Sequence, residues 1–443
     1  MNRKTENYFV IDKPKKYHLV SLGCPKNLVD SEVFAEILDE NFYSPTDNPE
    51  EAELILVNTC GFIADAKEES INTILEMAEY KKFKCEKLVV TGCLVKRYFE
   101  DLKSSIPEID NLINLKDFAK FSQSVFQKET NNFQNLYRNR KLLTLPHFAY
   151  IRISDGCNNH CSYCAIPAIR GNLQSVPMDF LIDEAKQLAR KGVKELIVTA
   201  QDTTQYGIDI YGKPMLSELL NRFHQIENFE WIRLLYLHPA HISSELIDKI
   251  ASLPKINKYF EIPLQHINND ILKSMNRRVS KEQIISIIEE IREKIPEAVI
   301  RTTFIVGYPG ETEKKFEELK KFISDFKFER LGIFTYSKEE NTKAFSLPNQ
   351  ISPKIAQKRK DELMEIQQQI SREFLENLVG KTVEVIIDKK SNEQNFQLEG
   401  RTYFDAPEID GTVFLTNNKA EVGEIAKVKI IDAWEYDLVG EII

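Results

Sequence analysis

Three cysteines lie close together in "SDGCNNHCSYCAIP" (154–167), at Cys157, Cys161 and Cys164. Three thiolates at the spacing C-x3-C-x2-C can hold three irons of a four-iron cluster and leave the fourth iron open to a small molecule. A zinc knuckle is the alternative, because zinc closes a structural site with four ligands and His160 lies in the same loop. His160 directly precedes Cys161 and would be strained in closing that site. The pattern therefore favours an iron–sulfur cluster with one open iron.

A second set of cysteines, Cys24, Cys60 and Cys93, ends the apolar runs "LVSLGC", "LILVNTC" and "LVVTGC". Each run is an expected strand that leads into an expected helix. Because the carboxyl ends of parallel strands share one edge, we expect these thiols side by side, facing helix N-termini that favour thiolate. Three convergent thiolates suit a second iron–sulfur cluster. The alternative is three buried core cysteines. Cys85 precedes its strand and is expected at the opposite edge, as a bystander.

The fold class expected is α/β, built from three parts that position these cysteines. Residues 14–130 alternate strand and helix, which predicts a doubly wound parallel sheet, and 131–147 is polar and basic enough to be a linker. Residues 148–378 contain six strand–helix units, which predict a partial or full β/α barrel with its reactive groups on the loops after the strands. Ser352 and Pro353 begin its last, long helix. Residues 379–443 predict a small antiparallel β-barrel.

The composition of the 443 residues excludes several classes of protein. The hydrophobic fraction is 42% and the charged fraction 29%, as in ordinary soluble globular proteins. The sequence contains no apolar run long enough for a membrane span, and its first residues do not form a secretory signal. We therefore expect a cytoplasmic protein, in whose reducing surroundings the seven cysteines are metal ligands or reactive thiols rather than disulfides. The net charge of -9 makes nucleic acid a less favoured partner.

The motif C-x3-C-x-aromatic-C, with Tyr163 as the aromatic residue, resembles that of radical S-adenosylmethionine (SAM) enzymes. The resemblance implies that the open iron binds SAM through its amino and carboxylate groups and that electron transfer yields a 5′-deoxyadenosyl radical. Nearly the whole chain is similar to the methylthiotransferases, which join a three-cysteine domain, a radical SAM barrel and a TRAM barrel. This similarity implies two [4Fe–4S] clusters, one on each set of three cysteines.

Within that family, "SLGCPKNLVDSE" (21–32) resembles the branch that modifies an aspartate of the twelfth small-subunit ribosomal protein. The branch that modifies transfer RNA carries Gln-Met-Asn where this chain has Pro25, Lys26 and Asn27. The resemblance implies that one SAM methylates a cluster-held sulfur and that a second generates the radical that activates the aspartate β-carbon. The implied partners are the ribosomal protein, free or in the ribosome, and an electron donor such as flavodoxin or ferredoxin.

Two other functions stay open at this point. One is the same chemistry on a transfer-RNA adenosine, and the other is a non-catalytic iron–sulfur protein that binds ribosomes or RNA. Residues 377–443 carry 7 Lys or Arg and 13 Asp or Glu. Four aromatic residues there could stack on bases, namely Tyr403, Phe404, Trp434 and Tyr436. The acidic balance nevertheless favours a basic protein as the partner.

The resemblance also extends to residues beyond the cysteines. Gln201 and Asp202 follow the second barrel strand, where radical SAM enzymes commonly approach the methionine amino group; the alternative for Asp202 is a helix cap. Gly307 in "VGYPGET" could bring backbone close to adenine, or simply form a turn. Three histidines follow predicted strands, namely His238, His241 and His266. A lone histidine is usually structural, and among these three His266 is the best candidate for the substrate cavity that the resemblance implies.

Overall fold

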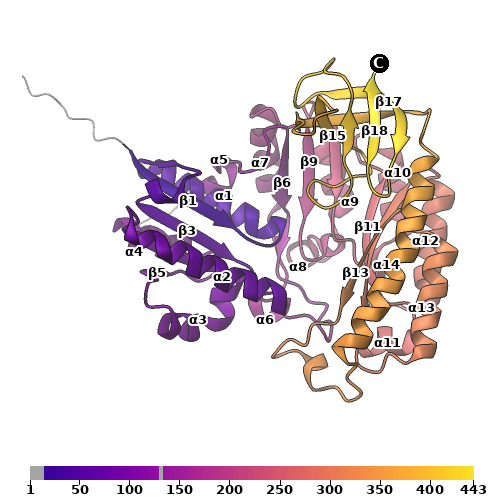
Figure 1. The fold of residues 1–443 in the computed structure, drawn as a ribbon, viewed down its shortest axis with the longest axis horizontal. Helices are drawn as coiled ribbons and strands as arrows, with labels where there is room; N and C mark the ends of the chain where they lie inside the picture. The colour runs from indigo at the N-terminus through magenta and orange to yellow at the C-terminus, as the bar shows by residue number, and fades with distance from the viewer. Residues whose placement is uncertain (1–13, 129–132) are drawn as a thin grey trace, which may run out of the picture. The chain divides into compact units, whose positions relative to one another are not determined.

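The structure is a computed structural model that describes residues 14–128 and 133–443. The chain divides into two compact units, Met1–Lys141 and Leu142–Ile443. They are the indigo-to-purple and the magenta-to-yellow parts of Figure 1. None of the helices in the described ranges is long and apolar enough to cross a membrane.

The first unit is built on a five-stranded parallel sheet in the order β2-β1-β3-β4-β5. Its strands are β1 (Lys15–Ser21), β2 (Tyr43–Pro45), β3 (Leu54–Thr59), β4 (Lys87–Gly92) and β5 (Asn111–Leu112). Its helices are α1 (Pro25–Glu40), α2 (Ala64–Glu79), α3 (Cys93–Ser105), α4 (Phe118–Phe126) and α5 (Phe133–Asn139), with short 3-10 turns η1 (Pro49–Glu51) and η2 (Tyr80–Lys82).

Both faces of this sheet are covered, as the alternation of strand and helix predicts. Along β3, Leu54 and Leu56 pack into a core with residues of α1 and α4. Ile55 and Val57 point the other way and pack with residues of α2 and α3. Successive side chains of a strand face opposite sides, so one continuous apolar run serves both cores. The sheet is therefore doubly wound.

The segment expected to be a linker is partly structured. Helix α5 occupies Phe133–Asn139, while residues 131 and 132 lie outside the described ranges. Arg140, directly after this helix, is fully buried, and its Nε lies 2.7 Å from a carboxylate oxygen of Glu32 in α1. Arg140 therefore packs as part of the first unit, because a buried charge needs its partner, whereas residues from Leu142 onward belong to the second unit.

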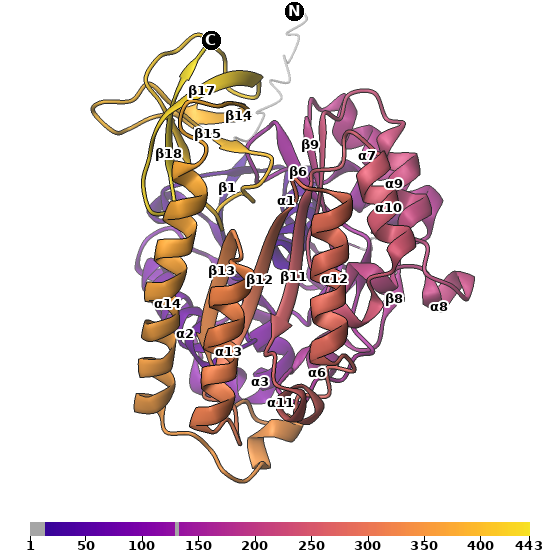
Figure 2. The ribbon, with the colours of Figure 1, turned by 90° about the vertical axis from the view of Figure 1, so that its right-hand side faces the viewer.

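The second unit contains six parallel strands that form a partial barrel (Figure 2). They form two sheets, β6-β9-β10 and β11-β12-β13, which meet where the Leu237 N–H donates to Glu261 O at 2.9 Å. The strands are β6 (Phe148–Arg152), β9 (Glu195–Thr199), β10 (Trp231–Leu234), β11 (Tyr259–Gln265), β12 (Val299–Val306) and β13 (Arg330–Thr335). A short hairpin, β7 (Ser154–Asp155) with β8 (Gln174–Ser175), follows β6. Their number agrees with the six strand–helix units that the sequence predicts for residues 148–378.

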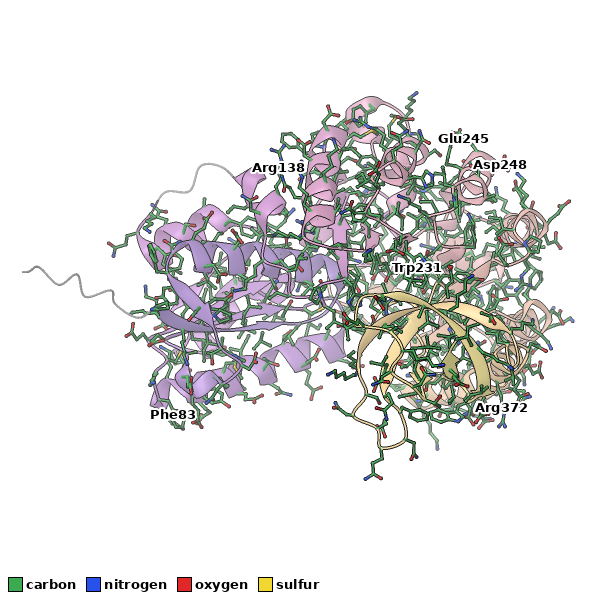
Figure 3. All side chains as sticks on the ribbon, turned by 90° about the horizontal axis from the view of Figure 1, so that it is seen from above. Phe83, Arg138, Trp231, Glu245, Asp248 and Arg372 are labelled. Atoms are coloured by element: carbon green, nitrogen blue, oxygen red, sulfur yellow. The ribbon has the colours of Figure 1, made fainter. Side chains whose placement is uncertain are left out.

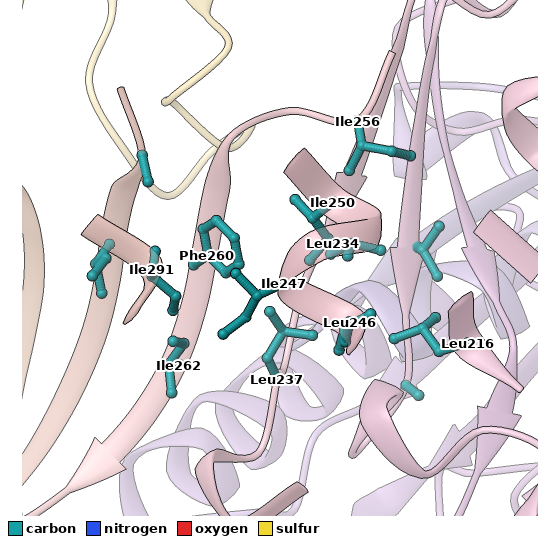
Figure 4. Packing of buried hydrophobic residues seen from close by; sticks show 14 of the residues in the cluster. Leu216, Leu234, Leu237, Leu246, Ile247, Ile250, Ile256, Phe260, Ile262 and Ile291 are labelled. Atoms are coloured by element: carbon teal, nitrogen blue, oxygen red, sulfur yellow. The ribbon is translucent and has the colours of Figure 1, made fainter. Parts of the chain in front are cut away.

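Helices cover the outside of the barrel and share its core. In Figure 4, Ile247 and Ile250 lie beside Leu234, Phe260 and Ile262 of the strands. Burying each such side chain contributes roughly 1.5–3 kcal/mol, so this cluster is a large stabilising contribution. The helices are α6 (Ile166–Arg170), α7 (Met178–Arg190), α8 (Ile208–Tyr211), α9 (Leu216–His224), α10 (Ser244–Ser252), α11 (Asn269–Ser274), α12 (Lys281–Lys294), α13 (Glu313–Phe326) and α14 (Pro353–Glu376), with 3-10 turns η3 (Thr203–Gln205), η4 (Pro239–His241) and η5 (Lys343–Ser346).

Helix α14 begins where the sequence predicts. Ser352 is its N-cap and accepts a hydrogen bond from the Ile355 N–H at 3.4 Å, and Pro353 fills the first turn. Near its other end Arg372, labelled in Figure 3, lies 3.7 Å from Glu435 of the C-terminal barrel.

The C-terminal barrel is closed, in the order β14-β15-β16-β18-β17. Its strands are β14 (Thr382–Lys390), β15 (Leu398–Thr402), β16 (Val413–Leu415), β17 (Ile425–Ala433) and β18 (Leu438–Ile442). The expectation of a purely antiparallel barrel is corrected at one place, because β16 and β18 pair in parallel. The reason is geometric: directions cannot alternate all the way around a closed ring with an odd number of strands.

A buried ion network joins the C-terminal barrel to the amino ends of the β/α strands. Glu195, the first residue of β9, lies 2.7 Å from Arg233 Nε and 2.8 Å from Arg401 Nη1. Arg401 also lies 2.7 Å from Asp388, which in turn lies 2.8 Å from His147 Nε2. Because these groups share partners, Glu195, Arg401 and Asp388 each have two partners in the network.

A second set of contacts continues the same interface. Arg330 at the start of β13 forms an ion pair with Asp405, and the Tyr259 hydroxyl donates to Asp410 at 2.7 Å. Arg301 Nε lies 3.2 Å from the other oxygen of Asp410. The C-terminal barrel is therefore attached to the amino edge of the strands, while α11 and the other loops that follow strand ends lie at the far edge (Figures 1 and 2).

Replacing Glu195 with Gln tests the weight of this network. Burial alone would raise the pKa of Glu195, but the guanidinium groups of Arg233 and Arg401 outweigh burial and hold the pKa below its usual 4.5. The carboxylate therefore stabilises the fold above about pH 4.5, and this contribution is lost as the pH falls further. We expect Glu195→Gln to lower the free energy of unfolding by about 3–5 kcal/mol at pH 7 and to weaken its dependence on acid.

Urea unfolding followed by circular dichroism at pH 7 and pH 4 measures both effects. The matched control is Glu230→Gln, which removes an exposed ion pair with Lys194 and should cost less than about 1 kcal/mol. Equal losses in the two variants would contradict the assignment.

Candidate functional site

The first set of cysteines lies at one edge of the sheet in the first unit. Cys24, Cys60 and Cys93 follow β1, β3 and β4, which are neighbours in the sheet. The register pairs Thr59 of β3 with Gly92 of β4, so Cys60 and Cys93 are the residues that directly follow this pair on the two neighbouring strands. Cys24 is the N-cap of α1, and Cys93 is the first residue of α3. The structure thus brings these cysteines together as parallel pairing predicts.

Two glycines allow the three loops to touch. A Cβ added to Gly23 would lie 2.8 Å from both Cβ and Sγ of Cys60. A Cβ on Gly61 would lie 2.8 Å from backbone atoms of Leu94 and 3.0 Å from the carbonyl carbon of Cys93. Side chains do not approach backbone this closely. The loop of Cys24 therefore packs against the side chain of Cys60, and the loop of Cys60 packs against the backbone at Cys93 and Leu94.

Polar side chains that sequence reasoning missed fix these loops. Ser70 Oγ accepts from the Cys60 N–H at 3.0 Å and donates to the Cys60 carbonyl at 2.8 Å. The Asn27 amide donates to the carbonyls of Leu22 at 3.0 Å and Thr59 at 2.9 Å. A buried polar residue in an otherwise apolar helix face was the available signal.

Cys85 lies at the opposite edge of the same sheet. It precedes β4 by two residues, and it packs in the apolar core beneath α2 and α3. Burial raises the pKa of its thiol. Its position agrees with the expectation of a bystander.

The second set of cysteines lies on the loop after β6 and β7. The Cys157 N–H donates to Gly171 O at 3.1 Å, and the Cys164 N–H donates to Cys161 O at 3.0 Å. Burial raises the pKa of Cys157 to about 11 and that of Cys164 to about 12. Metal binding must therefore remove protons that these thiols otherwise hold at neutral pH.

His160, the candidate fourth zinc ligand, has a left-handed backbone with φ of 51°. Its side chain is exposed, and its carbonyl accepts from the Asn276 amide at 3.0 Å. The exposed imidazole favours a site with three protein ligands over a closed zinc knuckle.

Three polar side chains lie beside this loop, on the segments that follow β9 and β10. One ligand atom from each of Asp202, His238 and His241 lies within 4.8 Å of the others. Asp202 caps η3 through the Thr204 N–H at 3.1 Å, which is the capping role considered for it. It also bonds His241 Nδ1 at 2.9 Å and accepts from the Asn159 amide at 2.8 Å. The aspartate thus links the strand end to the cysteine loop.

His238 is held in one tautomer within this group. Its Nδ1 accepts from the Ala240 N–H at 3.2 Å, so Nε2 carries the proton. Burial, reinforced by the charge of Arg277, lowers the pKa of His238 to about 2. Within the described residues its Nε2–H finds no acceptor. His238 is therefore a neutral, buried donor.

The remaining candidate residues occupy different surroundings. The Gln201 amide donates to Asp155 Oδ1 at 3.0 Å, and its buried Oε1 has no partner in the described ranges. Tyr163 packs against the apolar cluster that contains Tyr308. Gly307 has φ of 76° and donates its N–H to Glu311, and a Cβ there would lie 2.4 Å from the Ala356 Cβ. The glycine is thus required for α14 to pack.

The expectation that His266 is the best histidine for the cavity is wrong. Its side chain is fully buried, with Nδ1 accepting from the Asn268 N–H at 3.0 Å and Nε2 lying 3.4 Å from Glu311. Its position after a strand did not reveal that Glu311, far along the chain, would cover it. His238 and His241 are the histidines beside the cysteine loop.

Comparisons with known proteins agree with this architecture. Residues 16–114 match the uncharacterized protein family UPF0004, 151–323 the radical SAM superfamily and 379–443 the TRAM domain. The fold is similar to that of OxsB, a cobalamin-dependent S-adenosylmethionine radical enzyme, with a TM-score of 0.52 at 11% identity over 80% of this chain and 56% of OxsB.

Two curated relatives match from end to end. A protein of Lachnoclostridium phytofermentans described as ribosomal protein uS12 methylthiotransferase RimO is 46% identical over 96% of this chain and 99% of its own. A protein of Caldicellulosiruptor saccharolyticus with the same description is 47% identical over 97% of this chain and 100% of its own. The chain therefore belongs to the methylthiotransferase family of radical S-adenosylmethionine enzymes, as its cysteine spacing indicates.

Proposed function

We propose that this enzyme adds a methylthio group to the β-carbon of an aspartate in ribosomal protein uS12. The observation that carries the proposal is the end-to-end identity of 46–47% with relatives described as uS12 methylthiotransferases. The two separate sets of three cysteines at strand ends support it, because this chemistry needs two metal centres with open positions.

A radical SAM enzyme uses a [4Fe–4S] cluster and SAM, which together supply one-electron cleavage to a 5′-deoxyadenosyl radical. Cys157, Cys161 and Cys164 would hold that cluster. The donor set fits, since three thiols and an exposed histidine leave one iron without a protein ligand. Cys24, Cys60 and Cys93 would hold a second [4Fe–4S] cluster on the same principle, with a low-potential donor such as flavodoxin or ferredoxin reducing the enzyme.

Gln201 would orient SAM. Its amide is fixed by Asp155, so its buried Oε1, which no described residue contacts by a hydrogen bond, offers an acceptor for the ammonium group of the methionine moiety. Asp202 adds negative charge beside it, and Tyr163 packs under the cysteine loop. Gly307 would contribute through the turn after β12, although its own N–H is already donated to Glu311.

The C-terminal barrel favours a basic protein over RNA as the substrate. Residues 377–443 carry 7 basic and 13 acidic side chains, a balance that attracts a basic partner and repels phosphates. Of the four aromatic residues that could stack on bases, Phe404 is buried and Tyr403 donates its hydroxyl to Glu297 O at 2.9 Å. Only Trp434 and Tyr436 of these four are exposed.

The proposed activity is tested by anaerobic reconstitution with iron and sulfide, followed by incubation with SAM, a reductant and either uS12 or transfer RNA. We expect about eight irons in the wild type, about four in a Cys157→Ala, Cys161→Ala, Cys164→Ala variant, and 5′-deoxyadenosine from the wild type alone. The mass of uS12 should rise by replacement of H with SCH3. Modification of RNA alone would favour the adenosine substrate, and no cleavage of SAM would favour a binding protein.

Gly61→Ala tests the first cluster. The added Cβ would press on the Leu94 backbone at 2.8 Å and force the Cys60 and Cys93 loops apart. We expect a loss of about four irons, with the second cluster kept. Gly332→Ala is the matched control, because its Cβ would meet only Phe334 at 3.4 Å. The Cys85→Ser variant should also keep the full iron content of the wild type. Loss of iron from Cys85→Ser, or an unchanged iron content in Gly61→Ala, would contradict the ligand set.

Gln201→Ala tests the SAM subsite. Removing a hydrogen bond to a charged group costs about 1.5 kcal/mol or more, so we expect the Kd for SAM to rise at least tenfold with unchanged iron content. Calorimetric titration of reconstituted protein measures this, with the exposed Gln225→Ala as control. An unchanged Kd would remove Gln201 from the subsite.

A further inference from the structure

The last residue of α11 and the turn that follows it, together residues 274–277, are bound to the second cysteine loop. Four consecutive residues, Ser274 to Arg277, each contact residues between Asn159 and Ser162. The hydrogen bonds are Ser162 Oγ to Ser274 O at 2.7 Å, Ser162 N–H to Met275 O at 2.9 Å, and Asn276 Nδ2 to His160 O at 3.0 Å and to Asn159 O at 3.3 Å. Asn276 has φ of 56°, so a tight left-handed bend presents these groups to the loop.

Arg277 completes the series with a charge. Its Nη1 lies 3.6 Å from Cys161 Sγ, and its Nη2 donates to the Pro263 carbonyl. The side chain is only 4% exposed, and its Nε has no partner within the described residues. Arg278, next in the chain, is exposed. The turn thus buries one of two adjacent guanidinium groups, and it buries the one that points at a cluster ligand.

A buried cation at this position has an electrostatic consequence. Burial of a charge is costly unless an opposite charge compensates it. The carbonyl of Pro263 supplies a dipole, and Asp202 is the carboxylate whose charge acts on Arg277. A [4Fe–4S] cluster on three thiolates has one net negative charge when oxidised and two when reduced. A fixed positive charge beside a ligand sulfur stabilises the reduced form more, and low dielectric strengthens the effect.

We propose that Arg277 is a positioning residue that raises the reduction potential of the cluster on Cys157, Cys161 and Cys164, held against Cys161 by the 274–277 turn. The inference rests on the proposed cluster at these cysteines. It concerns the entry of one electron from an external reductant, and no bond forms or breaks in that step. The same turn therefore fixes the loop mechanically and adjusts its electron affinity.

The test isolates this cluster in the full-length chain. A Cys24→Ala, Cys60→Ala, Cys93→Ala background removes the other cluster, so that electron paramagnetic resonance reports a single [4Fe–4S] signal. Arg277→Gln keeps a hydrogen-bond donor without the charge, Arg277→Lys keeps the charge, and Arg278→Gln is the matched control. Each protein is counted for iron, checked for folding by circular dichroism and titrated with dithionite.

We expect Arg277→Gln to keep about four irons and to lose at least tenfold in the equilibrium constant for reduction, which is about 59 mV for one electron. Arg277→Lys should lower the midpoint potential by less than half of that amount. Arg278→Gln should have the midpoint potential of the background protein, because an exposed charge is screened. Equal midpoints for Arg277→Gln and Arg278→Gln would overturn the inference. Iron loss from both Arg277 variants in folded protein would also overturn it, in favour of a role in assembly. Absence of iron from the background itself would refute the proposed cluster, and the inference with it.

Discussion

Parallel strand pairing is the constraint on which the rest of this molecule depends. It forces the carboxyl ends of successive strands to one edge, and it does so in both units. In the first unit this edge gathers cysteines that are more than thirty residues apart in the sequence. In the second it gathers the cysteine loop, the Asp202 group and the turn at Ser274 to Arg277. Backbone pairing thus brings the residues of each site to one end of its sheet.

The C-terminal barrel is attached to the opposite end of the β/α strands. Glu195, Arg233 and Arg401 are buried there as an interlocked set, with Arg330 and Asp405 as a second pair. Buried ion pairs seldom add much stability over apolar packing, but an unmatched charge is strongly unfavourable. Such a network therefore admits one orientation of the C-terminal barrel and penalises others. The loops with candidate functional residues thus lie at the carboxyl ends of the strands, and the ion pairs that hold the C-terminal barrel lie at the amino ends.

Local patterns predicted most of this architecture because they report on local causes. The alternation of strand and helix predicted six β/α units, and Ser352 and Pro353 predicted the start of α14. The positions of Cys24, Cys60, Cys93 and Cys85 followed from strand ends alone. These features need only the period of hydrophobicity and the direction of parallel chains.

Features that depend on distant partners were not predictable in the same way. His266 follows a strand as His238 does, but only the fold places Glu311 beside His266 and leaves the Nε2 of His238 without an acceptor among residues 14–128 and 133–443. Arg277 and Arg278 are adjacent and identical, and only packing decides which is buried. The parallel pairing of β16 with β18 follows from closing a ring of five strands, and the number of strands in a ring is not a local property.

The placement of the C-terminal barrel at the amino edge sets a minimum size for any molecule recognised at both ends. Strand β6 is five residues long, and strand β12 is eight residues long. At about 3.3 Å per residue they span roughly 15–25 Å. A short peptide around the modified residue can occupy the cysteine edge and still fall short of the barrel. A folded body of ordinary domain width can reach both, so substrate selection can include a measure of size that no single loop sequence conveys.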